Sequence, residues 1–166
     1  MEYHNTKRPS SQMETTLEEA SQLRKLLKDL FASQSLAVLA TQDDGQSYGS
    51  LVAFAATGDL RHLLFATTRT TRKYANLLRN PKVAMVIDNR TNQPTDFHTA
   101  IAVTATGAVE EVHDPERIRL LRRYLSKHPY LKEFATSLTC ALLKMEVDTY
   151  FVVSKFQNVM ELHINK

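Results

Sequence analysis

One short segment, residues 66–73, contains the hydroxyl and basic side chains whose spacing best suits a chemical role. It includes Thr67, Thr71, Arg72 and Lys73. An apolar run precedes this basic turn and a helical pattern follows it, so the cations fall at the start of a helix. A helix N-terminus already carries about half a positive charge, and cations there imply an anion that offsets the repulsion. Free backbone N–H groups, Thr hydroxyls, an Arg fork and a Lys charge suit a phosphate group. The alternative is a basic turn that only faces solvent.

The distribution of charge also favours a small anionic ligand. The 166 residues carry a formal net charge of +3, and no acidic residue lies between Asp59 and Asp88, where Arg and Lys gather. A nucleic-acid surface normally spreads cations along a face and places aromatic side chains beside them. We therefore expect a small-molecule partner and no nucleic acid. A chain of this length suits one domain.

The lone cysteine and the hydropathy of the chain bear on its compartment. Cys140 lies in an apolar run and is expected to be a small core residue, and no internal disulfide can form. No apolar run approaches the roughly 18 residues of a membrane span. The N-terminus is polar and lacks the apolar region of a signal peptide. The sequence therefore predicts a cytoplasmic protein with no membrane partner.

No constellation of side chains indicates catalysis or metal binding. The six histidines are scattered, and the four glycines form neither a dinucleotide loop nor a P-loop. Glu110 and Glu111 are neighbours on an expected strand, so they face opposite ways and are interpreted as a strand end meeting solvent. We therefore expect no metal site, and the catalytic residues stay unknown.

The pattern of apolar residues predicts a mainly β domain with peripheral helices. A polar tail, residues 1–14, is expected to be flexible and to precede one domain, residues 15–166. Helices are expected at 15–33, at 71–79, and from 114 to a break at Pro129, with a short continuation to 134. Residues 89–96 are expected to form a loop. Strands are expected at 36–41, 48–56, 61–67, 83–87, 99–112, 143–148, 150–154 and 159–164. Short turns and few crossover helices favour an antiparallel barrel over a doubly wound parallel sheet.

The second expected strand is rich in small residues, which let a flat ligand lie close to the backbone. Ser50, Leu51 and Val52 would then offer main-chain donors and acceptors to a planar heterocycle. The alternative is that small residues only let barrel strands coil tightly.

The order and spacing of several motifs resembles the pyridoxamine 5′-phosphate oxidase-like FMN-binding split barrels. The likeness covers roughly residues 20–160. The segments that carry it are 36–41, Asp44-Gly45, Tyr48 to Val52, Phe65 to Thr67, Thr71 to Lys73 with Asn76-Leu77, and Asn80 to Val83.

This resemblance implies a six-stranded antiparallel split β-barrel that forms a homodimer and holds FMN at the subunit interface. It implies that Thr67, Thr71, Arg72 and Lys73 bind the FMN phosphate and ribityl chain. The residues implied to border the flavin ring are Ser50, Leu51, Val52 and Ala66, with Phe151 contributed by the partner subunit.

The positions that bind vitamin B6 phosphate in this family differ in the present chain. A Lys of the second strand falls on Ala55 or Ala56, an Arg falls on His128, and a Ser falls on Lys132, whereas Tyr124 is retained. Pyridoxamine phosphate is therefore not expected as the substrate, and Tyr124 and His128 are only candidates to line a substrate pocket.

Residues 123–130 are more similar to the haem-utilisation branch of these barrels, and a flavin-contacting residue of the fifth strand falls near Ala102. His163 is a weak candidate haem ligand. The sequence thus predicts an FMN-dependent oxidoreductase that acts on an unidentified small molecule or electron donor. Two alternatives stay open: a flavin- or haem-binding protein without catalysis, and an anion-binding module without redox chemistry.

Overall fold

The computed structural model describes residues 17–155 and 158–164, and the tail expected at 1–14 lies outside this part of the chain. Five helices and a 3-10 turn accompany the strands there: α1 Leu17–Ser33, α2 Arg72–Arg79, α3 Asp96–Thr99, α4 Glu116–Lys127, η1 Pro129–Leu131 and α5 Lys132–Thr136. The strands are β1 Leu36–Asp43, β2 Gln46–Ala56, β3 His62–Thr68, β4 Lys82–Asp88, β5 Ile101–Glu111, β6 Cys140–Ser154 and β7 Asn158–His163.

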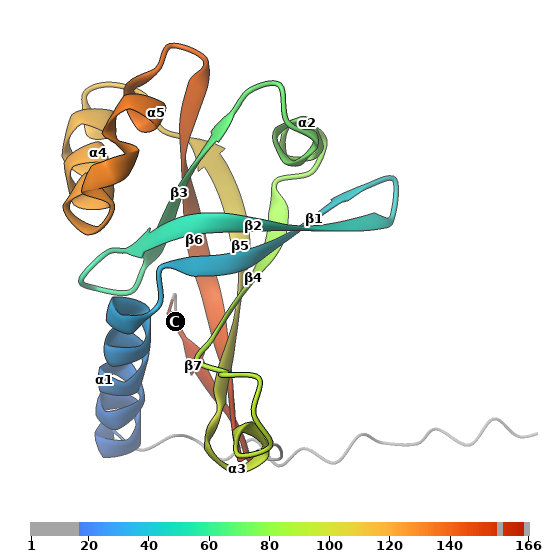
Figure 1. The fold of residues 1–166 in the computed structure, drawn as a ribbon, viewed down its shortest axis with the longest axis vertical. Helices are drawn as coiled ribbons and strands as arrows, with labels where there is room; N and C mark the ends of the chain where they lie inside the picture. The colour runs from blue at the N-terminus through green and yellow to red at the C-terminus, as the bar shows by residue number, and fades with distance from the viewer. Residues whose placement is uncertain (1–16, 156–157, 165–166) are drawn as a thin grey trace, which may run out of the picture.

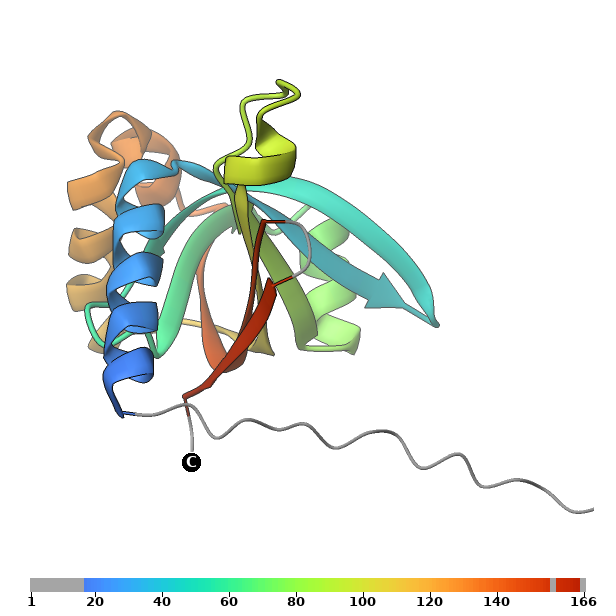
Figure 2. The ribbon, with the colours of Figure 1, turned by 90° about the horizontal axis from the view of Figure 1, so that it is seen from below.

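Six of these strands close into an antiparallel barrel, as predicted. The order is β3-β2-β1-β4-β5-β6, and a further pairing of β3 with β6 closes the ring (Figure 1). Strand β7 adds to the part of β6 beyond its contact with β3. Helices α4 and α5 lie against one side of the barrel, α2 lies at the base of the protruding β1–β2 hairpin, and α1 lies on the same side as α4 (Figure 2).

The main core lies inside the barrel and continues under α1. Alternate residues of the strands face inward, as with Ala37 and Leu39 of β1. The apolar stripe of α1, which includes Leu27 and Phe31, packs on the same cluster. Burying one such large side chain contributes about 1.5–3 kcal/mol. These contacts fix the barrel wall on which α2 and α4 rest.

The sequence pattern suggested two separate strands in 143–154, but the structure has one continuous strand, β6. Thr106 pairs with Thr149 while Gly107 pairs with Val147, so Asp148 is an extra residue in a β-bulge. The bulge moves the inward-facing positions by one residue. The alternation of apolar and polar residues is therefore interrupted there in the sequence, although the strand continues. At Gly107 a Cβ would lie 1.9 Å from the carbonyl oxygen of Glu146, so only glycine fits this close approach.

The expected loop at 89–96 is followed by a short helix, α3, that the sequence analysis missed. Asp96 accepts hydrogen bonds from the backbone N–H groups of Thr91, Asn92 and Gln93, which hold the loop against the start of α3. Strand β5 therefore begins at Ile101 and not at Thr99. Among the described residues, no helix has the length and the apolar content that a bilayer span requires.

Candidate functional site

The walls of the barrel separate between β2 and β3. Strand β2 pairs with β1 from Leu36↔Ala53 out to Asp43↔Gln46, but its ladder with β3 contains only the pairs of Phe54, Ala55 and Ala56. Strand β3 stays paired with β6 along its whole length. Residues 46–53 of β2 and 66–68 of β3 therefore form no backbone hydrogen bonds with each other across the two facing edges. We call the region between them the split.

The basic turn lies at the end of β3, beside this split, and leads into α2. Thr71 is the N-cap of α2, where its Oγ1 accepts from the N–H of Tyr74 at 3.4 Å and donates to the carbonyl of Thr68 at 3.0 Å. Thr67, which is buried, has its Oγ1 3.0 Å from that of Thr71. The two hydroxyls therefore lie together at the first turn of the helix. The sequence had predicted that the basic turn leads into a helix here.

Arg72 and Lys73 follow in the first turn of α2, and neither forms an ion pair with an acidic residue of the described chain. The other cations on either side do: Arg69 contacts Glu111, and Arg79 lies 2.6 Å from Asp43. The guanidinium of Arg72 lies over the ring of Tyr48, 5.3 Å from its centroid. Two positive charges thus remain uncompensated at a helix N-terminus, where the helix dipole also repels them.

Ser50 points to the same space from β2. It pairs with the buried Leu39, and Tyr48 pairs with Thr41, so the three polar residues Thr41, Tyr48 and Ser50 share the inward face. Helix α2 covers that face, since the side-chain amide of Asn76 donates to Thr41 at 3.0 Å. The Oγ of Ser50 is buried and has no hydrogen-bond partner in the described chain. Such an atom is rare in native proteins and indicates a missing partner.

The remaining predicted flavin residues reach the split in different ways. The side chain of Val52 is buried in the main core and that of Ala66 packs in a second apolar cluster under α4. Both can therefore border the split only through their backbone. Leu51 faces outward and is 66% exposed.

Glu111 has a role that the sequence analysis missed. Its carboxylate accepts from the guanidinium of Arg69 and, at 2.7 Å, from the hydroxyl of Tyr74. Arg69 also donates to the carbonyl of Leu138 at 2.8 Å. Burial alone would raise the pKa of Glu111, but the hydrogen bonds from Arg69 and Tyr74 lower it below its usual value. Glu111 is therefore not a free strand end, and it fixes the basic turn from both sides.

Tyr124 and His128 lie away from the split, in the second apolar cluster between α4 and the barrel. Both are almost fully buried, and their rings are 5.1 Å apart. The Nε2 of His128 lies 2.8 Å from the carbonyl of Phe54, and its Nδ1 lies 3.2 Å from the hydroxyl of Tyr130. Burial raises the pKa of Tyr124. Within this chain the two side chains pack in a closed core. They line neither the pocket beside β4, β5 and β6 nor the pocket between α1 and α4.

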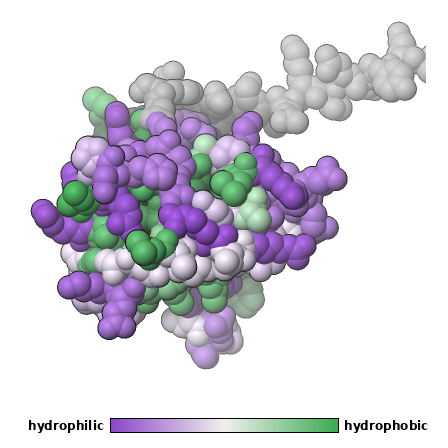
Figure 3. Space-filling view, turned by 90° about the horizontal axis from the view of Figure 1, so that it is seen from above, coloured by the Kyte–Doolittle hydropathy of each residue, from purple (hydrophilic) through white to green (hydrophobic). Residues whose placement is uncertain are grey.

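Phe151 belongs to a row of side chains on the outer face of the barrel. The register aligns Leu51, Val38, Val86, Thr104 and Phe151 across five strands. None of the five is buried, although most are apolar. By contrast, the end of the barrel that carries α2 and α5 is mostly hydrophilic, with hydrophobic side chains in small separate patches (Figure 3).

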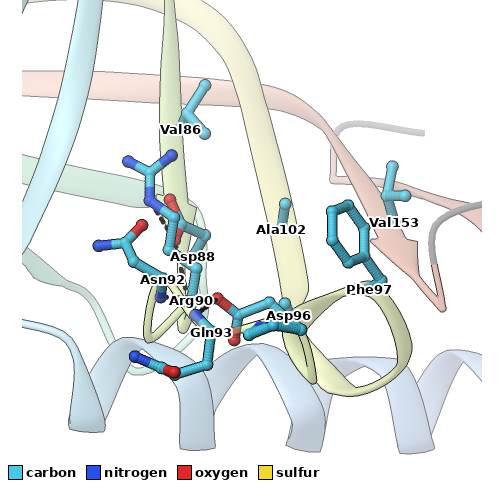
Figure 4. Close-up of a pocket in the computed structure, with 11 residues that line it drawn as sticks. Val86, Asp88, Arg90, Asn92, Gln93, Asp96, Phe97, Ala102 and Val153 are labelled. Carbon is cyan, nitrogen blue, oxygen red and sulfur yellow. Dashed lines mark hydrogen bonds and ion pairs between the residues drawn. The ribbon is translucent and has the colours of Figure 1, made fainter.

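A pocket of about 700 Å³ opens on this outer face, between β4, β5, β6 and the loop that precedes β5. Figure 4 shows Ala102 and Val153 as part of its apolar wall, with the ring of Phe97 beside them. The opposite side is polar, with an ion pair between Asp88 and Arg90 at 3.2 Å. Ala102, the position implied to lie near a flavin, is therefore on the same face as Phe151 and not in the split.

His163 and Cys140, which the sequence analysis also considered, have structural contacts. The Nδ1 of His163 lies 3.0 Å from the hydroxyl of Thr149, and its Nε2 lies 3.4 Å from Glu161. Cys140 is buried, as expected, in the cluster under α4. Among the described residues, no group of three His, Cys, Asp or Glu side chains is placed to hold a metal ion.

Comparison with solved structures finds the same fold in proteins of low sequence identity. A heme binding protein from Mycobacterium smegmatis superposes with a TM-score of 0.75 at 16% identity, over 87% of this chain and 57% of that one. General Stress Protein 26 from Bacillus anthracis gives 0.65 at 16%, over 86% and 98%. A FAD-binding protein from Mesorhizobium loti gives 0.60 at 19%, over 77% and 90%. The chain thus spans little more than half of the first of these proteins.

No curated protein sequence matches the chain. The family model described as pyridoxamine 5′-phosphate oxidase, however, matches residues 23–154, which include the barrel, the split and the basic turn. The sequence match and the closed six-stranded barrel agree. The chain belongs to the pyridoxamine 5′-phosphate oxidase family.

Proposed function

We propose that the chain binds FMN in the split, with the phosphate at the start of α2 and the flavin ring along the edge of β2. One observation carries this proposal: Arg72 and Lys73 have no acidic partner in the described chain, at the point where α2 begins beside the split. The partnerless Oγ of Ser50 lies on the face of β2 that α2 covers. A dianionic group and a hydrogen-bonding heterocycle would satisfy both.

The roles of the residues follow from their chemistry. Arg72 would grip phosphate oxygens through two parallel N–H groups, and Lys73 would act as a point charge. The hydroxyls of Thr67 and Thr71 would donate to phosphate or ribityl oxygens. Ser50, Leu51, Val52 and Ala66 would present backbone N–H and C=O groups to the ring. The bound flavin supplies hydride or electron transfer, and the protein supplies its binding and orientation.

We further propose that the protein is a homodimer in which the outer face of one barrel covers the split of its partner. The row from Leu51 to Phe151 is apolar except for Thr104, and none of its side chains is fully buried in the single chain, as expected of a surface that a partner covers. Phe151 of one subunit would then lie near the flavin of the other. The single cysteine is consistent with a cytoplasmic setting, which is part of this proposal.

We propose an oxidoreductase acting on a small molecule other than pyridoxamine phosphate. Of the positions where the family binds vitamin B6 phosphate, Ala55 and Tyr124 are buried in the cluster under α4, whereas Lys132 is exposed. His128 is fully buried against the carbonyl of Phe54. Buried side chains therefore occupy the place where the substrate phosphate would bind.

The absorption spectrum of the purified protein tests the flavin proposal. Flavin bands, or saturable uptake of added FMN with quenching of its fluorescence, are expected. A colourless protein that takes up no FMN would refute the proposal and favour a plain anion-binding module. Turnover of reduced nicotinamide by the flavin-loaded protein would then separate an enzyme from a carrier.

A second candidate is a haem-binding protein without flavin chemistry. It is favoured by the shared fold of the heme binding protein from Mycobacterium smegmatis. The exposed His163 is the candidate ligand, although both of its ring nitrogens already have neighbours. A Soret band in place of flavin bands, lost in His163→Ala, would support this candidate.

A further inference from the structure

A second pocket, of about 420 Å³, lies apart from the split, where α1 and α4 meet the turn between β2 and β3. Both helices lie on the same side of the barrel (Figure 2). The apolar part of the lining includes Phe31 and Leu60, and the charged part includes Lys28, Arg123 and Lys127. The volume lies within the range of about 300–1,000 Å³ that is typical of small-molecule sites. The lining therefore combines three cations with an apolar wall.

No carboxylate lines this pocket, and no acidic residue of the described chain forms an ion pair with its cations. The acidic residues nearest in sequence have partners other than these cations. Asp29 pairs with Lys25 at 2.6 Å. Asp59 accepts from the hydroxyl of Thr57 at 2.6 Å and from the backbone of Arg61. The positive charge of the pocket is therefore not neutralised by the protein.

Lys127 is the most enclosed of the three cations. Its Nζ donates to the carbonyls of Phe31 and Gln34, each at 2.7 Å, and lies 3.9 Å from the centroid of the Phe54 ring. These carbonyls belong to the end of α1, whose last turn contains no basic residue of its own. Burial, and then the charge of Arg123, lower the pKa of Lys127 to about 8. Lys127 therefore has a structural role and also contributes an uncompensated charge.

Arg123 is held at the edge of the pocket by one end of its guanidinium. Its Nε donates to the carbonyl of Ala56 at 3.0 Å, and its two terminal nitrogens have no partner in the described chain. The guanidinium is thus fixed in position while its terminal N–H groups remain free to donate. A guanidinium held in this way loses little conformational entropy when it binds an oxyanion. Lys28 faces it from α1.

We propose that this pocket binds a small organic anion, with Arg123 and Lys28 contacting its phosphate or carboxylate group and Ala32 and Ala56 packing against its apolar body. The site is independent of the split, since no residue of the basic turn lines it. It shares only Ala55 and Ala56 with the family's vitamin B6 phosphate positions, because Tyr124 and His128 are buried in the neighbouring cluster and do not line it.

Phenyl phosphate, benzoate and inorganic phosphate are suitable probes, titrated calorimetrically into the full chain saturated with FMN. Saturable binding of phenyl phosphate or benzoate is expected, tighter than that of inorganic phosphate because the ring adds apolar contact. Comparison of the first two identifies whether a phosphoryl or a carboxylate group is preferred. Failure of both to saturate would overturn the proposal.

Two double variants distinguish binding in this pocket from nonspecific electrostatic attraction of anions to a basic protein. Lys28→Gln/Arg123→Gln should weaken binding at least about tenfold, one decade being 1.4 kcal/mol. Arg119→Gln/Arg122→Gln removes the same amount of charge, from positions of α4 outside the pocket, and should leave the affinity unchanged. Equal losses in both variants, or no loss in the first, would show that the pocket is not the site.

The unaltered protein provides an independent measurement through Lys127. The other charged or hydroxyl side chains that line its pocket are Arg123, Lys28, Ser126 and Thr57, none of them acidic. A bound anion should therefore raise the pKa of Lys127 above about 8, as followed by NMR of its Nζ or Cε. A pKa that stays constant while phenyl phosphate saturates would place the ligand elsewhere.

Discussion

Helices α2 and α4 both lie against the barrel wall, but they differ in what they leave unsatisfied. Helix α2 begins with two cations that have no acidic partner, opposite the partnerless hydroxyl of Ser50. Helix α4 covers a closed apolar cluster in which the polar ring of His128 has partners at both nitrogens. A ligand would complete the first region and would disrupt the second. We therefore expect changes near α2 to affect binding, and changes under α4 to affect stability.

The largest expected effect is the loss of FMN binding in Arg72→Ala/Lys73→Ala. Each charge-assisted hydrogen bond contributes about 1.5–3 kcal/mol, so the double variant should bind at least about 100-fold more weakly. Fluorescence titration of FMN measures this loss. Arg79→Ala is the control, since it removes a cation from the other end of α2 that pairs with Asp43. Equal affinity in the double variant and the wild type would remove these residues from the site.

Under α4 the expected loss is in stability. His128→Ala removes a fully buried side chain and leaves the carbonyl of Phe54 without its partner, which should lower the free energy of unfolding by about 3 kcal/mol. Urea denaturation measures this change. Tyr130→Phe is a milder control, because Tyr130 is exposed and the change removes only its hydroxyl, which lies near Nδ1 of His128. If His128→Ala kept its stability and lost FMN affinity instead, the expectation that changes under α4 affect stability and not binding would be wrong.

Glu111→Gln should have an intermediate effect, because Glu111 holds the basic turn without contacting the ligand. With weaker bonds to Arg69 and Tyr74, FMN affinity should fall about tenfold, roughly 1.4 kcal/mol. A variant that binds FMN as tightly as the wild type would show that the turn keeps its shape without this carboxylate.

The same residue predicts a dependence on pH. Because the pKa of Glu111 is lowered in the folded protein, its contribution to stability is present above the ordinary value of 4.5. It is lost as the pH falls through the lowered pKa. The stability gap between wild type and Glu111→Gln should therefore narrow in acid, as thermal unfolding at a series of pH values would measure. A gap that is constant down to strongly acidic pH would contradict this.

The smallest expected effect is that of Thr67→Ala. It removes one neutral hydroxyl next to Thr71, worth about 1 kcal/mol, so FMN affinity should fall about fivefold. Thr70→Ala, which alters an exposed hydroxyl of the same turn, is the matched control. A loss as large as that of the Arg72/Lys73 variant would mean that the hydroxyls and not the charges dominate binding.

Local patterns in the sequence were enough to predict most of the elements and the basic turn. The helical stripe of α1, the start of α2 near Thr71 and the short turns are readable because each depends on residues a few positions apart. The pattern failed at β6, where one extra residue at Asp148 shifts the alternation. It also failed at α3, which is a single turn held by Asp96.

What the sequence alone determined is the family, through its resemblance to known members over most of the chain, and the barrel class, through the order of its elements. It also determined the location of excess positive charge. The tertiary structure decided which cations stay uncompensated. Glu111 and Asp43, 42 and 36 residues away from Arg69 and Arg79, neutralise those two, so that within the basic turn and α2 the charges of Arg72 and Lys73 are left. Ion pairs and buried contacts between distant residues depend on how the strands are arranged in space, and no local pattern encodes that arrangement.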